Sequence, residues 1–312
     1  MENKEKNFIS AVIYIRNAQT RADSFLRAVI GVMERYFEYS EIICMNDASD
    51  DRSLEVIRQA ADTACRTSVS VVNMSYFHGL ELTMNAGLDM AIGDFVFEFD
   101  NTILDFDPDV IMDLYWRSLE GYDIVSASPD RREKLSSRIF YQVFDRFANL
   151  SYGMSTESFR ILSRRVINRV GSMNKNILYR KAVYANCGLK TDQKKYPVKS
   201  GGSYDADKRE KGYRLGLAVD SLILFTELGY RFSIGMTMLM IVITVFVLVY
   251  TVAAYFMIHP AEGWTTTILF LSACFFGLFG IQTIIIKYLQ LLLDMVCKRK
   301  HYSFESIEKL TK

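Results

Sequence analysis

The chain has 312 residues, of which 50% are hydrophobic and 23% are charged, and its formal net charge is +1. This length allows one large domain or two small ones, and a near-zero charge without a basic and aromatic array argues against a nucleic-acid-binding protein. The five cysteines are scattered without disulfide-framework or zinc-ligand spacing, which indicates a reducing compartment.

Short apolar runs alternate with helical patterns from residue 8 to residue 126, which predicts a mostly parallel sheet covered by helices. Residues 1–7, before the first run, are charged and lack the pattern of a signal sequence. The expected strands are residues 8–15, 41–45, 68–72, 95–99 and 122–126. The expected helices are residues 21–36, 52–65, 80–90 and 108–119. Ligands of open α/β sheets bind beyond the carboxyl ends of the strands, so the candidate binding loops are residues 16–20, 46–51, 100–107 and 127–132.

In two of these loops, acidic residues lie directly or almost directly after the expected strand. Asp100 directly follows the strand of residues 95–99, where a carboxylate is suited to hold Mg²⁺ or Mn²⁺, although Asp also begins turns for local reasons. The loop of residues 46–51 reads Asn-Asp-Ala-Ser-Asp-Asp. It belongs to the ligand-binding edge, or it caps the following helix through Ser49 or Asp50.

Two later segments carry apolar residues at helical spacing. They cover approximately residues 134–151 and residues 211–232. Packing against a core and an in-plane position at a membrane interface both explain such a stripe. The second segment leads directly into an apolar run, which favours the interface there.

Two long apolar runs follow, at residues 234–258 and 264–287, within a segment of residues 233–293. As a helix the first is about 37 Å long, enough to cross a hydrocarbon core of about 30 Å. The runs therefore predict a transmembrane hairpin, and two buried core helices of a soluble protein are the alternative. Lys and Arg flank the pair and are absent from residues 259–263 between them. The positive-inside rule then places the N-terminal domain and a tail of residues 294–312 in the cytoplasm, with the hairpin in the inner membrane.

Several segments keep a characteristic order along almost the whole chain. They are SAVIYIRNAQT, EIICMNDASDD, SYFHGLELTMNAGLDMAIGDFVFEFD, SSRIFYQVF, SFRILSRRVINRV, GGSYDADKREKGYRLGLAVDSLILFT and IKYLQLLLDMVCKRKHYSFESIE. In order and spacing they resemble the inverting glycosyltransferases of family 2, which have the GT-A fold. The resemblance is to the branch that includes dolichol-phosphate mannose synthase and bacterial polyprenyl-phosphate glucosyl- and aminoarabinosyl-transferases.

The resemblance implies an α/β domain over residues 1–210, Rossmann-like, with interfacial amphipathic helices and the two-helix hairpin after it. It implies transfer of a sugar from a nucleotide-sugar to a polyprenyl (undecaprenyl-type) phosphate, for cell-surface glycans, with Mg²⁺ or Mn²⁺ on the diphosphate. The implied nucleotide-sugar contacts are Asn17, Asn46, Asp47, Gly79 and Asp100. The implied catalytic residues are Asp100, Glu157 and Ser158. The implied metal ligands are Asp100 and Thr102, and the implied contacts to the lipid phosphate are Arg131, Arg132, Ser203 and Tyr204.

The chain departs from the family pattern at the positions that carry chemistry. The metal motif Asp-x-Asp is Asp100-Asn101-Thr102 here, which predicts a weakened metal site. A shifted alignment pairs Glu98 with Asp100, two residues apart and so on one face of a strand, but it needs gaps and ranks second. Other family carboxylates are replaced by Asn46, Ala18 and Ser158.

These departures leave a second class of function open. A transferase fold that has lost catalysis would act as a binding or regulatory partner of a membrane glycosylation enzyme. A processive polysaccharide synthase is disfavoured, because two spans are too few to enclose a translocation channel. The expected partners are a nucleotide-sugar, a polyprenyl phosphate and a lipid bilayer, and self-association is left open.

Overall fold

The computed structural model describes residues 4–131, 137, 140–142, 156–173, 179–199, 208–225, 232, 235–236, 238–240, 242–243, 246, 264–297 and 302–311. The chain divides into two units. The first comprises Met1–Asp145, Leu150–Leu217 and Arg299–Lys312, and the second comprises Arg146–Asn149 and Ala218–Lys298.

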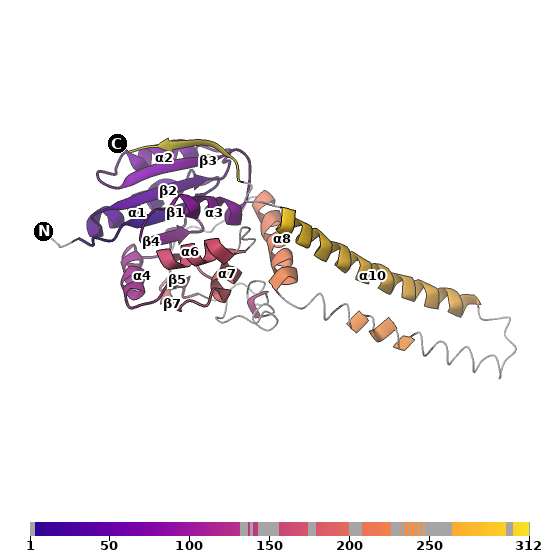
Figure 1. Ribbon diagram of the computed structural model, residues 1–312. Helices are drawn as coiled ribbons and strands as arrows, with labels where there is room; N and C mark the ends of the chain where they lie inside the picture. The colour runs from indigo at the N-terminus through magenta and orange to yellow at the C-terminus, as the bar shows by residue number, and fades with distance from the viewer. Residues whose placement is uncertain are drawn as a thin grey trace. The chain divides into compact units, whose positions relative to one another are not determined.

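The first unit is built on an eight-stranded sheet of order β7-β5-β6-β4-β1-β2-β3-β8 (Figure 1). The strands are β1 (Ile9–Ile15), β2 (Ser40–Asn46), β3 (Ser68–Met74), β4 (Phe95–Phe99), β5 (Ile124–Pro129), β6 (Phe159–Ser163), β7 (Thr191–Tyr196) and β8 (Phe304–Lys309). Strands β1 to β4 are parallel, as expected. The sheet as a whole is mixed, because β6 runs antiparallel to β4 and β5, and β8 runs antiparallel to β3.

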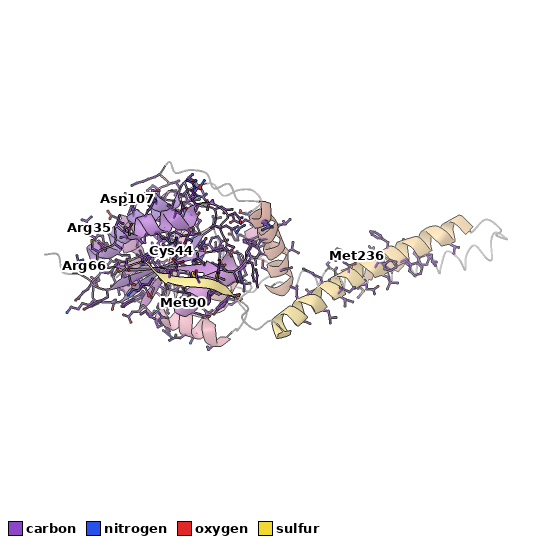
Figure 2. The ribbon with its side chains drawn as sticks, turned by 90° about the horizontal axis from the view of Figure 1, so that it is seen from above. Arg35, Cys44, Arg66, Met90, Asp107 and Met236 are labelled. Carbon is purple, nitrogen blue, oxygen red and sulfur yellow. The ribbon has the colours of Figure 1, made fainter. Side chains whose placement is uncertain are left out.

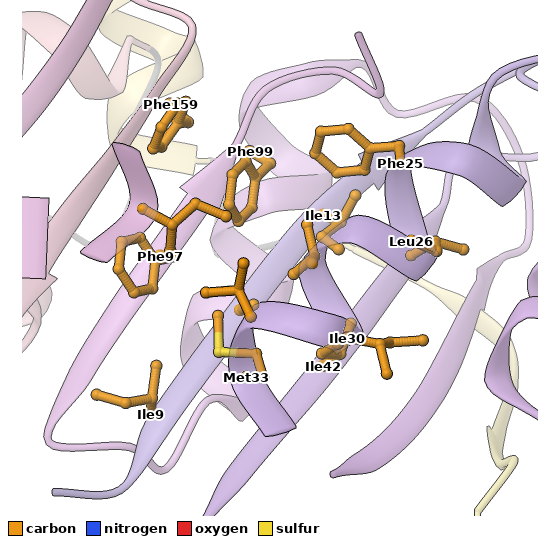
Figure 3. Close-up of a cluster of buried hydrophobic side chains, with 14 of the residues drawn as sticks. Ile9, Ile13, Phe25, Leu26, Ile30, Met33, Ile42, Phe97, Phe99 and Phe159 are labelled. Carbon is orange, nitrogen blue, oxygen red and sulfur yellow. The ribbon is translucent and has the colours of Figure 1, made fainter. Parts of the chain in front are cut away.

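The inner strands are buried on both faces, and the alternation of side chains along β1 assigns each face to different helices. The helices that the structure describes in this unit are α1 (Ala22–Tyr36), α2 (Ser53–Ala61), α3 (Leu80–Met90), α4 (Asp109–Leu119), α6 (Arg164–Met173), α7 (Arg180–Asn186) and the first part of α8 (Lys208–Phe225). Ile9 and Ile13 face a buried cluster with residues of α1 such as Phe25 and Met33 (Figure 3). Val12 faces the other side, where Gly87 of α3 approaches so closely that an added Cβ would lie 2.4 Å from Val12 Cγ1.

Burial also determines the chemistry of the cysteine at the centre of β2. Cys44 is fully buried among the side chains of the sheet domain (Figure 2). Burial raises the pKa of its thiol to about 12, so Cys44 stays protonated and packs as a small apolar group.

The segment expected as a cytoplasmic tail does not trail from the domain. Residues 304–309 form the edge strand β8, paired with β3 from Ser70↔Lys309 to Met74↔Phe304. An ion pair of 2.7 Å between Arg58 of α2 and Glu308 joins β8 to the neighbouring helix. The C-terminal segment therefore closes one edge of the sheet.

The second unit contains the long helix α10 (Trp264–Cys297), which carries Lys287 and Asp294 as its charged residues. Lys287 Nζ lies 2.8 Å from Asp220 Oδ1 of α8. Within the described part of the chain, no helix combines the length and the hydropathy that crossing a membrane requires. Most of the first expected span, residues 234–258, lies outside the described residues, as does most of the expected interfacial helix of residues 134–151.

Gly93→Ala and Gly31→Ala are expected to change stability in opposite directions. At Gly93 an added Cβ would lie 2.6 Å from the main-chain nitrogen of Ser10 in β1, so the backbone has to shift. We expect Gly93→Ala to cost about 1–3 kcal/mol. Gly31 lies within helix α1 with nothing within 4 Å of the added Cβ, and Ala there should gain about 0.5–1 kcal/mol. Chemical denaturation of both variants measures this, and a Gly93→Ala variant as stable as the wild type would contradict the packing described for Gly93.

Candidate functional site

The loops that follow β1 and β2, at the carboxyl ends of these strands, are joined by hydrogen bonds. The buried Arg16 donates from Nη1 to the main-chain oxygens of Asp47 at 2.7 Å and Ala48 at 2.8 Å. Asn17 has a φ of 44°, and its side-chain oxygen accepts a hydrogen bond of 2.9 Å from Asp50 N. Asn17, a predicted nucleotide contact, therefore sets the shape of both loops.

Asn46, another predicted nucleotide contact, joins strands. Its Nδ2 donates to Asn73 Oδ1 of β3 at 2.8 Å, and its Oδ1 accepts from Ser49 N at 3.3 Å. An Asp at this position could not donate to Asn73 in its charged form, so the departure from the family pattern fits this local hydrogen bond.

Asp47 connects the end of β2 to the loop that follows β3. Its carboxylate is fully buried and accepts three hydrogen bonds, from Tyr14 Oη at 3.0 Å, His78 N at 2.8 Å and Gly79 N at 2.9 Å. Gly79 precedes helix α3 with φ 83° and ψ 166°, a conformation available essentially to glycine alone. Asp47 thus holds the backbone that begins α3.

Two arginines bridge the carboxylates of Glu98, which lies in β4, and of Asp100, the residue that follows β4. Arg160 of β6 donates to Glu98 Oε2 and to Asp100 Oδ2, both at 2.9 Å. Arg180 of α7 donates to Glu98 Oε1 at 2.6 Å and to Asp100 Oδ1 at 2.8 Å. The two carboxylates therefore share one face of the chain, as alternation along a strand requires, and both are bound by guanidinium groups.

Two further carboxylates complete this cluster. Glu81 of α3 accepts from Arg180 Nε at 2.8 Å, and Glu157 accepts from Arg160 Nε at 3.2 Å. The side chains of both arginines are 1% exposed, and Glu98 is fully buried. Four carboxylates share two guanidinium groups, so the cluster, named here the arginine–carboxylate cluster, keeps surplus negative charge.

Ion pairing shifts the pKa values of Asp100 and Arg180 in the cluster. Burial alone would raise the pKa of Asp100, but the adjacent charges of Arg160 and Arg180 outweigh burial and hold that pKa well below its ordinary value. Burial would lower the pKa of Arg180, and Glu98 and Glu81 instead raise it well above the ordinary value. Asp100 is therefore a carboxylate throughout the physiological pH range.

The described residues do not fit a divalent metal ion at Asp100. Both of its oxygens accept guanidinium hydrogen bonds, Thr102 replaces the second carboxylate, and the Thr102 side chain is 3% exposed. In the ranges that the structure describes, no three His, Cys, Asp or Glu side chains lie together in a metal-binding arrangement. Of the two expected metal ligands, Asp100 and Thr102, only Asp100 is charged, and its carboxylate is already bound by the two guanidinium groups.

A second carboxylate should strengthen metal binding at this position. Because the wild-type residues do not fit the ion, we expect Thr102→Asp, which restores the missing charged ligand, to bind Mn²⁺ at least about tenfold more tightly than the wild type, equivalent to about 1.4 kcal/mol. Titration with Mn²⁺, followed by calorimetry on the wild type and the variant, measures the change. Thr102→Asn, which adds a similar volume without charge, is the control. Equal affinities in all three proteins would show that residue 102 does not face a metal.

Ser158, the residue before β6, takes part in a chain of hydrogen-bonded hydroxyl groups. Its Oγ is 2.6 Å from Tyr196 Oη, which donates to Asp105 Oδ1 at 2.9 Å. Burial raises the pKa of Tyr196 well above its ordinary value, so the phenol stays protonated and can donate a hydrogen bond. Ser158 is thereby tied to Asp105, in the loop that follows Asp100.

The predicted lipid-phosphate contacts are only partly described. Arg131 has a side chain that is 59% exposed, and its Nη1 lies 4.0 Å from Asp105 Oδ2. Arg132, Ser203 and Tyr204 lie outside the described residues.

The sequence reading missed the residues that bind Asp100. Arg160 stands directly opposite Glu98 in the β4–β6 ladder, and Arg180 comes from a short helix far along the chain. Arg160 belongs to the segment SFRILSRRVINRV, and only the pairing of β6 with β4 places it opposite Glu98. Nothing local marks Arg180.

These observations define a class of protein. The sheet has a parallel core of four strands that is extended by strands of both directions, and polar loops and a carboxylate lie at the carboxyl ends of β1, β2 and β4, where open α/β sheets bind their ligands. The family model for glycosyl transferase family 2 matches residues 10–184, and the chain belongs to that family.

Similar proteins of known sequence agree with this assignment. An uncharacterized glycosyltransferase of Synechocystis sp. is 27% identical over 188 residues, which cover 58% of this chain and 58% of that protein. The match thus spans less than two thirds of that relative's length. A prophage bactoprenol glucosyl transferase homolog of Escherichia coli is 26% identical over 232 residues, covering 72% of this chain and 74% of that protein.

Among solved structures, glucosyl-3-phosphoglycerate synthase of Mycobacterium tuberculosis in complex with phosphoglyceric acid has a similar fold. Its TM-score is 0.50 at 13% sequence identity, and the alignment covers 70% of this chain and 78% of that one. This likeness bears out the expected α/β fold of the GT-A type and carries no information on substrate.

Proposed function

We propose that this protein transfers a sugar from a nucleotide-sugar to a polyprenyl phosphate at the cytoplasmic face of a membrane. The observation that carries the proposal is the similarity to a bactoprenol glucosyl transferase homolog over 232 residues, 72% of the chain. This similarity covers more residues than the family model does, which matches residues 10–184. Bactoprenol is a polyprenyl lipid, and a lipid acceptor fits a chain with two long apolar runs.

The reaction requires positioning more than proton transfer. An oxygen of the lipid phosphate attacks the anomeric carbon, and the bond from that carbon to the nucleotide diphosphate breaks with its electron pair leaving on the diphosphate. The phosphate is already ionised, so no general base is needed, and orientation provides most of the rate. No step relies on a metal ion, because the described residues at Asp100 do not fit one.

The residues of the chain then have distinct roles. The loops held by Arg16, Asn17 and Asp47 would bind the nucleotide, since they lie at the carboxyl ends of β1 and β2. Asp100 would stabilise positive charge that develops at the anomeric carbon, as an ionised carboxylate can. Arg131 would pair with the acceptor phosphate, with Arg132, Ser203 and Tyr204.

Membrane attachment would come from the two apolar runs. Residues 234–258 carry no charge, and α10 exposes large apolar side chains along much of its length. Those with half or more of their surface exposed are Leu271, Phe275, Phe276, Leu278, Phe279, Ile285, Ile286, Leu289 and Leu292. An exposed apolar surface of this kind is stable in lipid and costly in water. Lys and Arg beside both runs favour a cytoplasmic position for the sheet domain.

A second function is favoured by one feature of the site. The carboxylates of the arginine–carboxylate cluster outnumber its cations even when the neighbouring Lys181 is included. Surplus negative charge beside the expected place of a diphosphate opposes anion binding. On this reading the chain is a binding or regulatory partner of another membrane glycosylation enzyme.

One experiment separates the two functions. Full-length protein in lipid nanodiscs is mixed with undecaprenyl phosphate and, in turn, with radiolabelled UDP-glucose, UDP-N-acetylglucosamine and GDP-mannose, with and without Mg²⁺. Label that moves into the lipid extract with the wild type and not with Asp100→Ala supports the enzyme. Nucleotide-sugar that neither binds nor reacts in any combination would overturn the proposal and leave the partner function. Arg27→Ala, which removes an exposed ion pair on α1, is the control.

A further inference from the structure

The loop of residues 75–79, between β3 and α3, is contacted by three separate parts of the chain, and we name it the junction loop. Through His78 N and Gly79 N it donates to both carboxylate oxygens of Asp47, at 2.8 and 2.9 Å. The loop is thus a direct neighbour of the loops proposed to bind the nucleotide.

The segment that follows α10 in sequence holds the same loop from a second side. Ser303 N donates to His78 Nε2 at 3.2 Å, and Ser303 O accepts from Ser75 N at 3.0 Å and from Ser75 Oγ at 2.8 Å. Tyr302 donates to the carboxylate of Asp89 in α3. These bonds lie at the start of β8, where the chain returns from the apolar region.

The segment that precedes the apolar runs holds the loop from a third side. Tyr213, in the part of α8 that belongs to the sheet unit, lies against Gly79, where an added Cβ would be 2.4 Å from the Tyr213 ring. The same ring meets Phe77 edge to face, with 5.8 Å between centroids. The guanidinium carbon of Arg16, from the loop after β1, lies 4.4 Å from the centroid of the same Phe77 ring.

His78 stands at the centre of these contacts. Its Nδ1 is 2.5 Å from Tyr76 O and its Nε2 faces the Ser303 amide, so the imidazole donates from Nδ1 and accepts at Nε2. The ring is also stacked on Tyr76, with 4.0 Å between centroids. The side chain therefore connects Ser303 to the loop, while the main chain of the same residue connects the loop to Asp47.

We propose that the junction loop couples the nucleotide site to the two chain segments that enter and leave the apolar runs, with His78 as its positioning residue. In this arrangement β8 is part of the framework of the nucleotide site, so the position of the C-terminal segment sets the position of the His78 and Gly79 amides. The identity of the ligand rests on the proposed function, and the coupling itself does not.

Hydrogen–deuterium exchange on full-length protein in nanodiscs tests the coupling without any ligand. In His78→Ala, the amide of residue 303 loses its acceptor, and the loop that carries the amides of residues 78–79 loses its side-chain bond to Ser303. All three amides should therefore exchange at least about tenfold faster than in the wild type. His78→Gln, whose side-chain oxygen can accept from Ser303, should restore part of the protection. Ile307→Ala, which truncates an exposed side chain of β8, should leave residues 75–79 unchanged. Unchanged exchange at residues 78–79 in His78→Ala, with melting temperature unaltered, would overturn the proposal.

Calorimetric titration with UDP and with GDP gives a second readout on the same proteins. We expect His78→Ala to weaken whichever nucleotide binds the wild type by about tenfold and His78→Gln to weaken it less. If His78→Ala binds as tightly as the wild type, the coupling does not reach the nucleotide site and the proposal fails. If neither nucleotide binds the wild type, the proposed function is in error, and the exchange experiment alone decides the coupling.

Discussion

An Arg180→Met variant is expected to lose about 3–5 kcal/mol of unfolding free energy, because it removes one guanidinium partner from each of three buried carboxylates. Arg180 contacts three of them, Glu81, Glu98 and Asp100, and Glu98 has no access to solvent. Methionine fills much of the volume, so the loss reports charge and not a cavity. Denaturant unfolding of the sheet domain, followed by circular dichroism on the full-length protein, measures the change.

Arg58→Met is the matched control for that measurement. Arg58 also makes an ion pair of 2.7 Å, with Glu308, but both side chains are partly exposed, at 48% and 35%. An exposed pair contributes about 0–1 kcal/mol. Equal losses in the two variants would mean that the arginine–carboxylate cluster is not the buried network described for it.

The arginine–carboxylate cluster also predicts that acid lowers the stability of the protein. The pKa of Asp100 is lower in the folded state, so its contribution is present at neutral pH and is lost as the pH falls below the ordinary range of a carboxylate.

Asp47→Asn is expected to weaken nucleotide binding by at least about tenfold and to cost about 2–4 kcal/mol of stability. The carboxylate of Asp47 accepts from Tyr14, His78 and Gly79, and an amide in its place turns one acceptor into a donor that faces a main-chain N–H group. The start of α3 would then shift. Calorimetric titration with UDP and GDP and a denaturant melt report the two effects separately.

Asp50→Asn provides the comparison within the same loop. The Asp50 side chain is 78% exposed and lies 3.7 Å from Arg16, so its neutralisation should change stability by less than about 0.5 kcal/mol. A loss of stability at Asp50 as large as that at Asp47 would show that loop charge matters more than the buried hydrogen bonds.

Strands β1 to β5 could be predicted because they are apolar runs between helical patterns, whereas β6, which lies between β4 and β5, was not among the expected strands. The expected residues 95–99 and 80–90 coincide with β4 and α3, and the other early elements differ by a few residues at their ends. The helix at α4 begins at Asp109, with Pro108 as its N-cap, one residue later than expected. Burial on both faces produces this signal and fixes these elements.

The outer strands could not be predicted because edges of a sheet lack that signal. In β7 the sequence TDQKKY is polar and partly exposed, and in β8 the sequence FESIEK alternates between partly buried and exposed side chains. Polar edge strands protect a sheet from pairing with other chains, and they resemble loops or tails in the sequence. This explains why the C-terminal segment was expected outside the domain.

In the candidate site, too, some residues could be predicted from the sequence and others could not. The positions of Asp47 and Asp100, at the ends of β2 and β4, follow from strand boundaries, and the structure places both residues there. Their partners come from tertiary structure: His78 from the loop after β3, Arg160 from β6 and Arg180 from α7. A metal ion at Asp100 was expected from a motif, whereas the two guanidinium groups at its oxygens depend on contacts that no local pattern encodes.

Mass spectrometry of the lipid extract tests the proposed function most directly. Full-length protein in nanodiscs with undecaprenyl phosphate and the panel of nucleotide-sugars should yield one new lipid, heavier than undecaprenyl phosphate by one glycosyl group, together with an equal amount of nucleoside diphosphate. Asp100→Ala should yield neither. A wild-type protein that produces no such lipid with any donor, or that releases nucleoside diphosphate and free sugar at the same rate with and without the lipid, would contradict transfer to a polyprenyl phosphate.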